Sequence, residues 1–242
     1  VLPRIGQHIS WIWKGNRTMR KTIWSAAVIG LMALAAQAGG EDAGFGDVVT
    51  TDIKLQGNIE GYGDGLVVGA CGITIDLNGY TIESLDGTGT GISNADGYSD
   101  VEIRNGTIEN FAEGIHSDGG GMLRIKSITV DGASGPQGTT GAIHVLDTDD
   151  VRIEKCKTIV ESIFLGAHGI RLDTVTDVRV KKCEIVGGFV GISFFSVTQD
   201  DDPTTGKVED CDVEGCFLGI LIGNSDDAEI KHCRITDADG LG

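Results

Sequence analysis

Basic residues are scarce in this sequence. Lysine and arginine number 19 against 36 aspartate and glutamate residues, so the chain of 242 residues has a formal net charge of −17 at pH 7. Such an excess of negative charge repels the phosphate backbone of DNA and RNA. We therefore expect no nucleic-acid partner.

Helical periodicity is also missing. Between short runs of alternating apolar and polar residues, such as 101–104 (V-E-I-R) and 178–181 (V-R-V-K), no amphipathic helical stripe of useful length occurs. An alternation with a period of two is typical of β-strands. Without helices to return the chain across a sheet, βαβ units are excluded, and successive strands must be joined by turns.

What the sequence does contain is a repeat of 21 to 28 residues. Residues 169–185 show one complete unit, which has a Gly-Ile opening, two alternating strands around an Asp-rich turn, and a Cys-x-Ile third strand. The units open at Gly65, Gly91, Gly114, Gly141, Gly169, Gly191, Gly219 and Gly240. A period of this length is typical of stacked repeats, so we predict an all-β, single-stranded solenoid of about seven coils.

Residues 19–38 have the three parts of a secretory signal peptide. They comprise a charged start (M-R-K), the apolar run 23–36, and the cleavage pattern A-Q-A at 36–38. A membrane anchor is the weaker alternative, because the apolar run is short for a membrane span. We therefore expect export, and we interpret residues 1–18, which precede the signal, as a misplaced start.

Residues 39–242 form the predicted solenoid domain. Removal of residues 1–38 leaves 14 basic and 36 acidic residues, a net charge of −22. Nothing in the domain resembles a linker or a transmembrane segment, so we expect one domain, and the sequence does not indicate its oligomeric state. The chain stops where a further coil would begin, and because solenoids end in capping repeats we expect a truncated C-terminus.

Two segments carry a resemblance to a known family. Residues 64–82 read D-G-L-V-V-G-A-C-G-I-T-I-D-L-N-G-Y-T-I, and residues 101–115 read V-E-I-R-N-G-T-I-E-N-F-A-E-G-I. They resemble the right-handed parallel β-helix repeats of bacterial secreted proteins in the pectate-lyase-like superfamily. The resemblance implies a right-handed parallel β-helix that is secreted, periplasmic or on the cell surface. It does not specify the function, because that superfamily includes lyases, glycoside hydrolases, epimerases and adhesins.

The catalytic motifs of that superfamily are incomplete here. Residues 167–170 (A-H-G-I) are similar to the G-H-G-I segment of polygalacturonase-like hydrolases, but threonines at 139–140 stand where that family has an acid pair. Residues 124–126 (R-I-K) resemble that family's R-I-K, yet they precede the histidine motif instead of following it. No pectate-lyase calcium trio is found, and only residues 202–203 (D-P) match the start of the epimerase pattern Asp-Pro-His.

Four cysteines share one repeat position, Cys156, Cys183, Cys211 and Cys233. Apolar or small residues occupy this position in other coils, so we predict an inward ladder with about 4.8 Å between successive chains. Disulfides within the pairs 156/183 or 211/233 are compatible with that spacing in an exported protein. We favour unpaired, buried thiols that act as small apolar groups. Zinc is not expected at them, because no Cys-x-x-Cys or Cys/His spacing occurs.

Aspartates precede the second strand of several coils, at positions 100, 150, 177 and 227. Stacked carboxylates are suited to Ca²⁺, which prefers oxygen ligands. Aspartate is also an ordinary turn residue whose side chain bonds the backbone. The turn interpretation is favoured, Ca²⁺ remains an alternative, and no other cofactor is indicated.

The first strands predict a catalytic patch. Isoleucines at 115, 143, 170 and 192 point inward, so the residues after them point outward in one column. The candidate catalytic residues on this patch are His116, Asp118, His144, Arg171 and Asp173. They offer proton donors, acceptors and a cation for a substrate carboxylate, whereas a solvated polar face is the alternative.

The second strands predict a substrate-binding column of Arg124, Arg152 and Arg179. Like charges on adjacent strands repel, so this column requires anions. Asp150 and Asp177 can supply them from within the chain, and a bound polyanion is the other possibility.

Two functions follow from these patterns. The first is a carbohydrate-active enzyme, similar to polysaccharide lyases, that acts on an extended and acidic polysaccharide. The second is a non-catalytic surface solenoid that binds a cell-surface glycan or another protein. The outward His-His-Arg column favours the enzyme, and the incomplete family motifs favour the binding protein.

Overall fold

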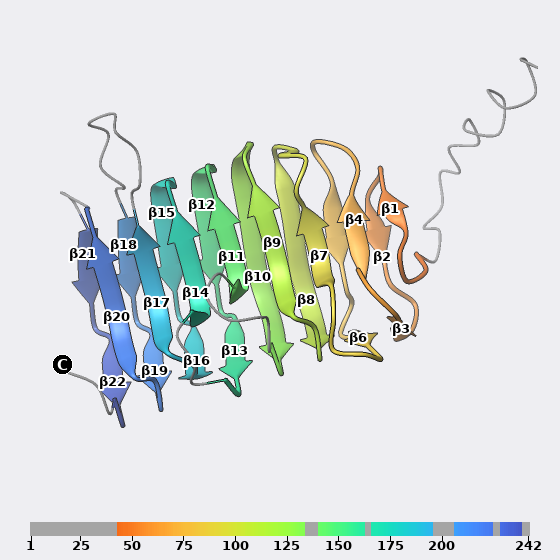
Figure 1. Ribbon diagram of the computed structural model, residues 1–242. Coiled ribbons are helices and arrows are strands. Elements are labelled where there is room, and N and C mark those ends of the chain that lie inside the picture. Colours follow the sequence, from red (N-terminus) through yellow and green to blue (C-terminus); the bar gives the residue numbers. More distant parts are fainter. Residues whose placement is uncertain (1–42, 134–139, 163–165, 196–205, 225–227, 239–242) are drawn as a thin grey trace, which may run out of the picture. The chain divides into compact units, whose positions relative to one another are not determined.

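The computed structural model describes residues 43–133, 140–162, 166–195, 206–224 and 228–238, which are drawn in colour in Figure 1. Every regular element in these ranges is a β-strand, which confirms the all-β prediction. The described residues contain no helix that could cross a membrane. The predicted signal peptide, the segment before it, the turn residue Asp227 and the last coil opening lie outside the described residues.

One sheet is formed by the first strand of each coil. Its eight strands, in spatial order, are β1 (Val48–Val49), β4 (Leu66–Val68), β7 (Thr90–Asn94), β9 (Glu113–Asp118), β11 (Thr140–Leu146), β14 (Ala167–Asp173), β17 (Val190–Phe195) and β20 (Leu218–Gly223). We call it the first sheet.

The remaining fourteen strands form a second sheet that bends around the other sides of the coil. The second strands of the coils are β2 (Ile53–Lys54), β5 (Thr74–Asp76), β8 (Val101–Glu109), β10 (Gly121–Asp131), β12 (Asp149–Glu154), β15 (Thr176–Lys181), β18 (Gly206–Glu209) and β21 (Ala228–Lys231). The third strands are β3 (Ile59–Gly61), β6 (Thr81–Ser84), β13 (Lys157–Val160), β16 (Glu184–Gly187), β19 (Asp212–Glu214) and β22 (Arg234–Thr236). In β8 and β10 the second and third strands merge into one bent strand, which joins the two sides.

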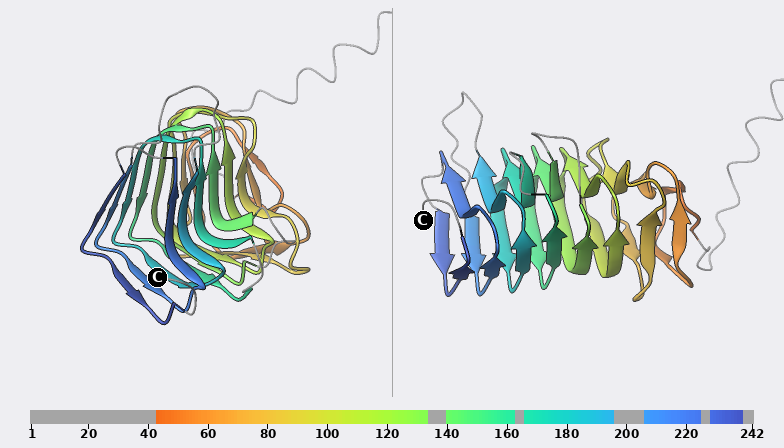
Figure 2. Two further views of the ribbon diagram at one scale, coloured as in Figure 1. Left: turned by 60° about the vertical axis from the view of Figure 1, so that its left-hand side comes forward. Right: turned by 60° about the horizontal axis from the view of Figure 1, so that its bottom comes forward.

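Strands of successive coils pair in parallel and in the predicted register. Ile143 lies opposite Ile115 on one side and Ile170 on the other, and Ile170 lies opposite Ile192. Figure 2 shows these strands side by side in successive coils around a common interior. The described residues therefore form a parallel β-helix, as the repeat predicted.

A column of glycines explains why each unit opens on glycine. At Gly65, Gly91, Gly114, Gly169, Gly191 and Gly219 an added Cβ would collide with an apolar side chain of the third strand, and at all but Gly219 also with a backbone carbonyl of the next coil. These positions lie where the first strand passes over the third, too close for any side chain. In the coil that opens at residue 141, this column is occupied by Ala142 and not by Gly141. The neighbouring coil shows this, since a Cβ added to Gly114 would meet the carbonyl oxygen of Ala142. That coil has room for one methyl group.

The cysteine ladder lies inside the β-helix. Cys156, Cys183 and Cys211 are buried, Cys233 is partly buried, and all four are free thiols. Their sulfur atoms lie 3.6 to 3.8 Å from backbone carbonyl oxygens of the preceding coil. The predicted inward ladder is confirmed by the burial of Cys156, Cys183 and Cys211, and in the described structure these thiols pack as small apolar groups.

Turn aspartates adopt the conformation that turns require. Asp100, Asp150 and Asp177 have φ values of 58°, 51° and 43°, in the left-handed region that aspartate tolerates better than most residues. This conformation accounts for aspartate at these positions without a calcium ion.

Candidate functional site

The first sheet aligns the predicted catalytic residues as the repeat required. His144 on β11 lies opposite His116 on β9 and Arg171 on β14. Two residues along the strand, Leu146 lies opposite Asp118 and Asp173. The predicted columns are therefore correct.

The prediction that these residues form one exposed patch is wrong. His144 and Asp173 are each only 6 % exposed, and His116 and Arg171 are partly buried. Asp118 is exposed, and in the described ranges its side chain makes no hydrogen bond or ion pair with the others. The other four side chains each contact a charged or polar neighbour, some on the same strand and some across the coils.

Glu113 is the central residue of this arrangement, and sequence analysis did not identify it. Its Oε1 lies 2.9 Å from His144 Nδ1, and its Oε2 lies 3.1 Å from His116 Nδ1. A strict period of two would turn Glu113 inward with Ile115. Gly114 also faces the interior, against Val130, and this interrupts the alternation and turns Glu113 outward. The one feature of the sequence that could have identified Glu113 is its position directly before a Gly-Ile opening. Two coils later, His168 occupies the same position.

Asp173 extends the contacts to the next coil. Its Oδ2 lies 3.2 Å from His144 Nε2 and accepts a hydrogen bond of 2.7 Å from Arg171 Nε. Five ionisable side chains from β9, β11 and β14 thus form one connected group, which we call the histidine cluster: Glu113, His116, His144, Arg171 and Asp173.

The charges of the histidine cluster stabilise one another. Burial would raise the pKa of Glu113, but its contacts with His116 and His144 outweigh burial and lower the pKa. Burial would lower the pKa of His144, but hydrogen bonds to Asp173 and Glu113 raise it overall. Burial also opposes ionisation of Asp173, and the hydrogen bond with His144 and the charge of Arg171 keep its pKa below the ordinary value.

His168 lies beside this cluster, and its pKa is lowered whereas that of His144 is raised. It is 7 % exposed, and its Nδ1 lies 2.7 Å from Ser193 Oγ, which is fully buried. Burial, followed by repulsion from Arg171, lowers the pKa of His168 to about 4, so the ring is neutral at pH 7. The sequence showed this histidine within an A-H-G-I segment but did not indicate that it adjoins the predicted patch.

Replacement of His168 by glutamine is expected to reduce the loss of stability on acidification. The ordinary pKa of histidine is 6.5, so below that pH the unfolded chain takes up a proton that folded His168 accepts only near pH 4. His168 therefore destabilises the folded protein progressively as the pH falls from 6.5 towards 4. Arg171, Asp173 and His144, the charges that affect His168, are unchanged in the variant. Chemical unfolding at about pH 7 and about pH 4.5 measures the difference.

The exposed His232 provides the control for this prediction. Its side chain is 81 % exposed, so His232→Gln measures the effect of a histidine-to-glutamine replacement outside the buried cluster. An equal loss of stability on acidification in the wild type and His168→Gln would contradict the prediction.

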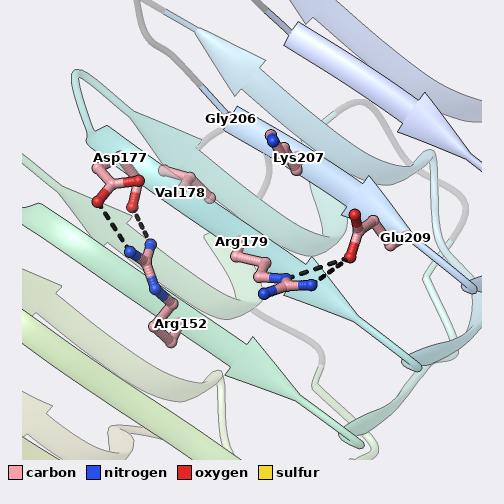
Figure 3. A pocket seen from close by; sticks show the side chains of 7 residues that line it. All are labelled: Arg152, Asp177, Val178, Arg179, Gly206, Lys207 and Glu209. Atoms are coloured by element: carbon pink, nitrogen blue, oxygen red, sulfur yellow. Dashed lines mark hydrogen bonds and ion pairs between the residues drawn. The ribbon is translucent and has the colours of Figure 1, made fainter.

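The predicted basic column lies on the second sheet. Arg152 lies opposite Arg124 and Arg179, in the predicted register. Lys207 continues the column opposite Arg179. A groove of about 430 Å³, lined in part by Arg152, Arg179 and Lys207, follows this column and is drawn in Figure 3.

Carboxylates of the chain itself neutralise two of the arginines that line this groove. Arg152 Nη2 lies 2.9 Å from Asp150 Oδ1 and 2.8 Å from Asp177 Oδ2. Arg179 donates two hydrogen bonds to Glu209 Oε2, at 2.6 and 3.2 Å (Figure 3). The expectation that Asp150 and Asp177 supply anions is thus confirmed for Arg152, whereas the acid at Arg179 is Glu209.

Arg124 is less firmly held than the other two. Its Nη1 lies 3.6 Å from Asp100 Oδ1, and both side chains are largely exposed. A bound polyanion is therefore not needed to balance the column, and it would compete with internal carboxylates. Substrate binding by the three arginines stays a prediction.

Comparison with known proteins identifies the repeat. A family model described as a right-handed beta helix region matches residues 43–199. Neither the curated proteins nor the solved structures include a significant match to this chain.

Proposed function

Because the chain belongs to the right-handed β-helix family, we propose that it is a carbohydrate-active enzyme that cleaves an extended acidic polysaccharide by β-elimination at the histidine cluster. The observation that supports this is the contact of five ionisable side chains from three coils on the outer face of the first sheet. Burial of ionisable groups is costly, and a parallel β-helix does not require them there. Such groups are concentrated at functional sites.

Elimination at a uronate needs a positive group at the substrate carboxylate and a group that removes a proton. Arg171 is the positive group. Its Nε is held by Asp173, and within the described part of the chain its two terminal nitrogens make no hydrogen bond. Its side chain is 20 % exposed, so these nitrogens can bind a carboxylate in the paired geometry that arginine favours.

The group formed by Glu113, His116 and His144 removes the proton. His116, with a side chain that is 22 % exposed, is its most accessible member, and Glu113 and His144 lie behind it. Asp173 is a positioning residue, because it contacts His144 and Arg171 on the same oxygen. Hydrolysis by two free carboxylates is disfavoured, since both carboxylates of the cluster are engaged by imidazoles.

The repeat suits a polymeric substrate. Successive coils are spaced by about 4.8 Å, close to the length of one sugar residue, so a glycan can follow a column of side chains along the β-helix axis. The negative net charge repels a polyuronate only within about 8 Å in physiological salt. Arg124, Arg152 and Arg179 are the candidates for further substrate carboxylates. The proposal includes export from a bacterial cell, and the pattern of residues 19–38 supports it.

The test is an assay for unsaturated product, by ultraviolet absorbance, on pectate, alginate and glycosaminoglycans. Arg171→Ala and His144→Ala are each expected to lower kcat/KM by about 100-fold or more, because each removes a group that acts in proton transfer or charge stabilisation. Arg234→Ala, at an arginine whose side chain is 71 % exposed, is the control and is expected to retain activity.

A non-catalytic, glycan-binding solenoid is the second candidate. The groove along Arg152 and Arg179 favours it, since that groove is independent of the histidine cluster. Absence of product on every polysaccharide, with glycan binding that survives both substitutions in the cluster, would replace the enzyme by this candidate.

A further inference from the structure

We infer that Glu113, His116 and His144 bind one divalent transition-metal ion of the zinc type. This inference rests on the proposed function in that it concerns the same site, and it specifies how that site acts. It differs from the cysteine-based zinc sites that the sequence did not lead us to expect, because the ligands are a Glu-x-x-His pair on β9 and a histidine on the neighbouring strand β11.

The ligand atoms are already gathered. One atom from each of Glu113, His116 and His144 lies within 4.8 Å of the other two. Zinc binds imidazole nitrogen at about 2.0–2.1 Å and carboxylate oxygen at about 2.0–2.2 Å, so tetrahedral ligands lie about 3.3 Å apart. The contacts of 2.9 and 3.1 Å between Glu113 and the two Nδ1 atoms are only slightly shorter than this separation. Two histidines and one glutamate are also a ligand set of catalytic zinc sites.

The surroundings of His144 have the arrangement of a metal-binding histidine. Metal-bound imidazoles give their other ring nitrogen's proton to a carboxylate or carbonyl, which fixes the ring. With Nδ1 directed at the ligand group, His144 directs Nε2 at Asp173 Oδ2, 3.2 Å away. Arg171 in turn holds the same oxygen. The ring is therefore oriented from behind by a residue that is itself held in place.

His116 has a buried ring nitrogen that makes no hydrogen bond within the described part of the protein. Among the described residues, His116 Nδ1 makes no hydrogen bond, and its 3.1 Å contact with Glu113 lacks hydrogen-bond geometry. Buried polar atoms are nearly always satisfied, and an unsatisfied one points to a missing water or ion. An ion between His116, His144 and Glu113 would give this nitrogen a partner.

The donor set selects a transition metal over calcium. Imidazole nitrogen suits zinc, copper, iron and nickel, whereas calcium takes six to eight oxygen ligands. Three protein ligands leave a fourth position open for water or substrate. An ion there would add a positive charge near Arg171 and would lower the pKa of a bound water molecule, so that with metal bound this water, held by the three side chains, would accept the proton in place of an imidazole.

Titration of the full-length, chelator-treated protein with Co²⁺ and Zn²⁺ tests the inference. We expect one equivalent of metal after gel filtration, a visible absorption band of tetrahedral Co²⁺, a higher melting temperature, and no displacement by Ca²⁺. Glu113→Gln and His116→Ala are expected to weaken binding at least tenfold, and Asp173→Asn about 10- to 100-fold. His232→Ala is the matched control, since His232 has an aspartate neighbour at 3.3 Å on the surface.

Less than a tenth of an equivalent in the wild type, or a Co²⁺ spectrum unchanged by Glu113→Gln, would overturn the inference. The wild-type titration needs no variant, so it tests the inference even if a variant folds poorly. Lyase activity that is as high in the metal-free protein as in the loaded protein would overturn the role of the metal in elimination and leave the proposed function standing. Stoichiometric binding without product on any polysaccharide would support the metal site and overturn the proposed elimination.

Discussion

Gly191→Ala is expected to destabilise the protein by about 3 kcal/mol, since overpacking of this kind typically costs 1–3 kcal/mol and sometimes more. A Cβ at this position would lie 2.6 Å from the carbonyl oxygen of Gly219 and would also collide with the side chain of Val213. One obstacle is backbone of the next coil, so a side-chain rotation cannot relieve the clash. Chemical unfolding followed by circular dichroism measures the change.

Gly121→Ala is the matched control for this substitution. Gly121 opens β10, and the atoms nearest to an added Cβ, on Asp149, are 4.0 Å away. Alanine there also restricts the unfolded chain, which favours the folded state where the native backbone is compatible. We expect the stability of Gly121→Ala to equal or exceed that of the wild type. If both variants lose the same stability, the crowding of the glycine column is not the cause.

Asp173→Ala is expected to cost about 3 kcal/mol, because removal of one partner of a buried ion pair leaves the others without compensation. Asp173 Oδ2 is the shared partner of His144 and Arg171, and the Asp173 side chain is only 9 % exposed. Without it, His144 would keep Glu113 as its one carboxylate partner among the described residues. The free energy of unfolding near neutral pH measures the loss.

Asp212→Ala removes a comparable but exposed pair. Asp212 Oδ1 lies 3.0 Å from Arg234 Nε, and both side chains are largely exposed. Exposed pairs contribute little to stability because water and salt screen them. We expect no loss beyond experimental error in this control. A neutral result for Asp173→Ala as well would show that the contacts of the histidine cluster are not coupled to folding.

The fold and its columns could be predicted because each coil repeats one apolar pattern. A shift of one residue would turn a whole inward set, such as Ile143 or Ile170, to the solvent, so the pattern determines the register. For this reason the His116, His144 and Arg171 column and the arginine column both lie where the repeat places them. The buried cysteines follow from the same rule.

The site depended on geometry that the period of two does not contain. The interruption at Gly114 turns Glu113 outward, between two histidines that the sequence showed as separate surface residues. Likewise, the carboxylate that pairs with Arg179 is Glu209 of the next coil, and the sequence pattern had indicated Asp177.

The sequence by itself determined an all-β parallel helix, the position of each strand and the direction of most side chains, because these follow from the local alternation of apolar residues. Only the tertiary structure decided that His144 and Asp173 are buried and that Glu113 joins them. Alternation specifies on which face of the strand a side chain lies. The distance between side chains on neighbouring coils depends on their rotamers and on the close approach of the coils at the glycine column, and both are determined only when the coils are stacked.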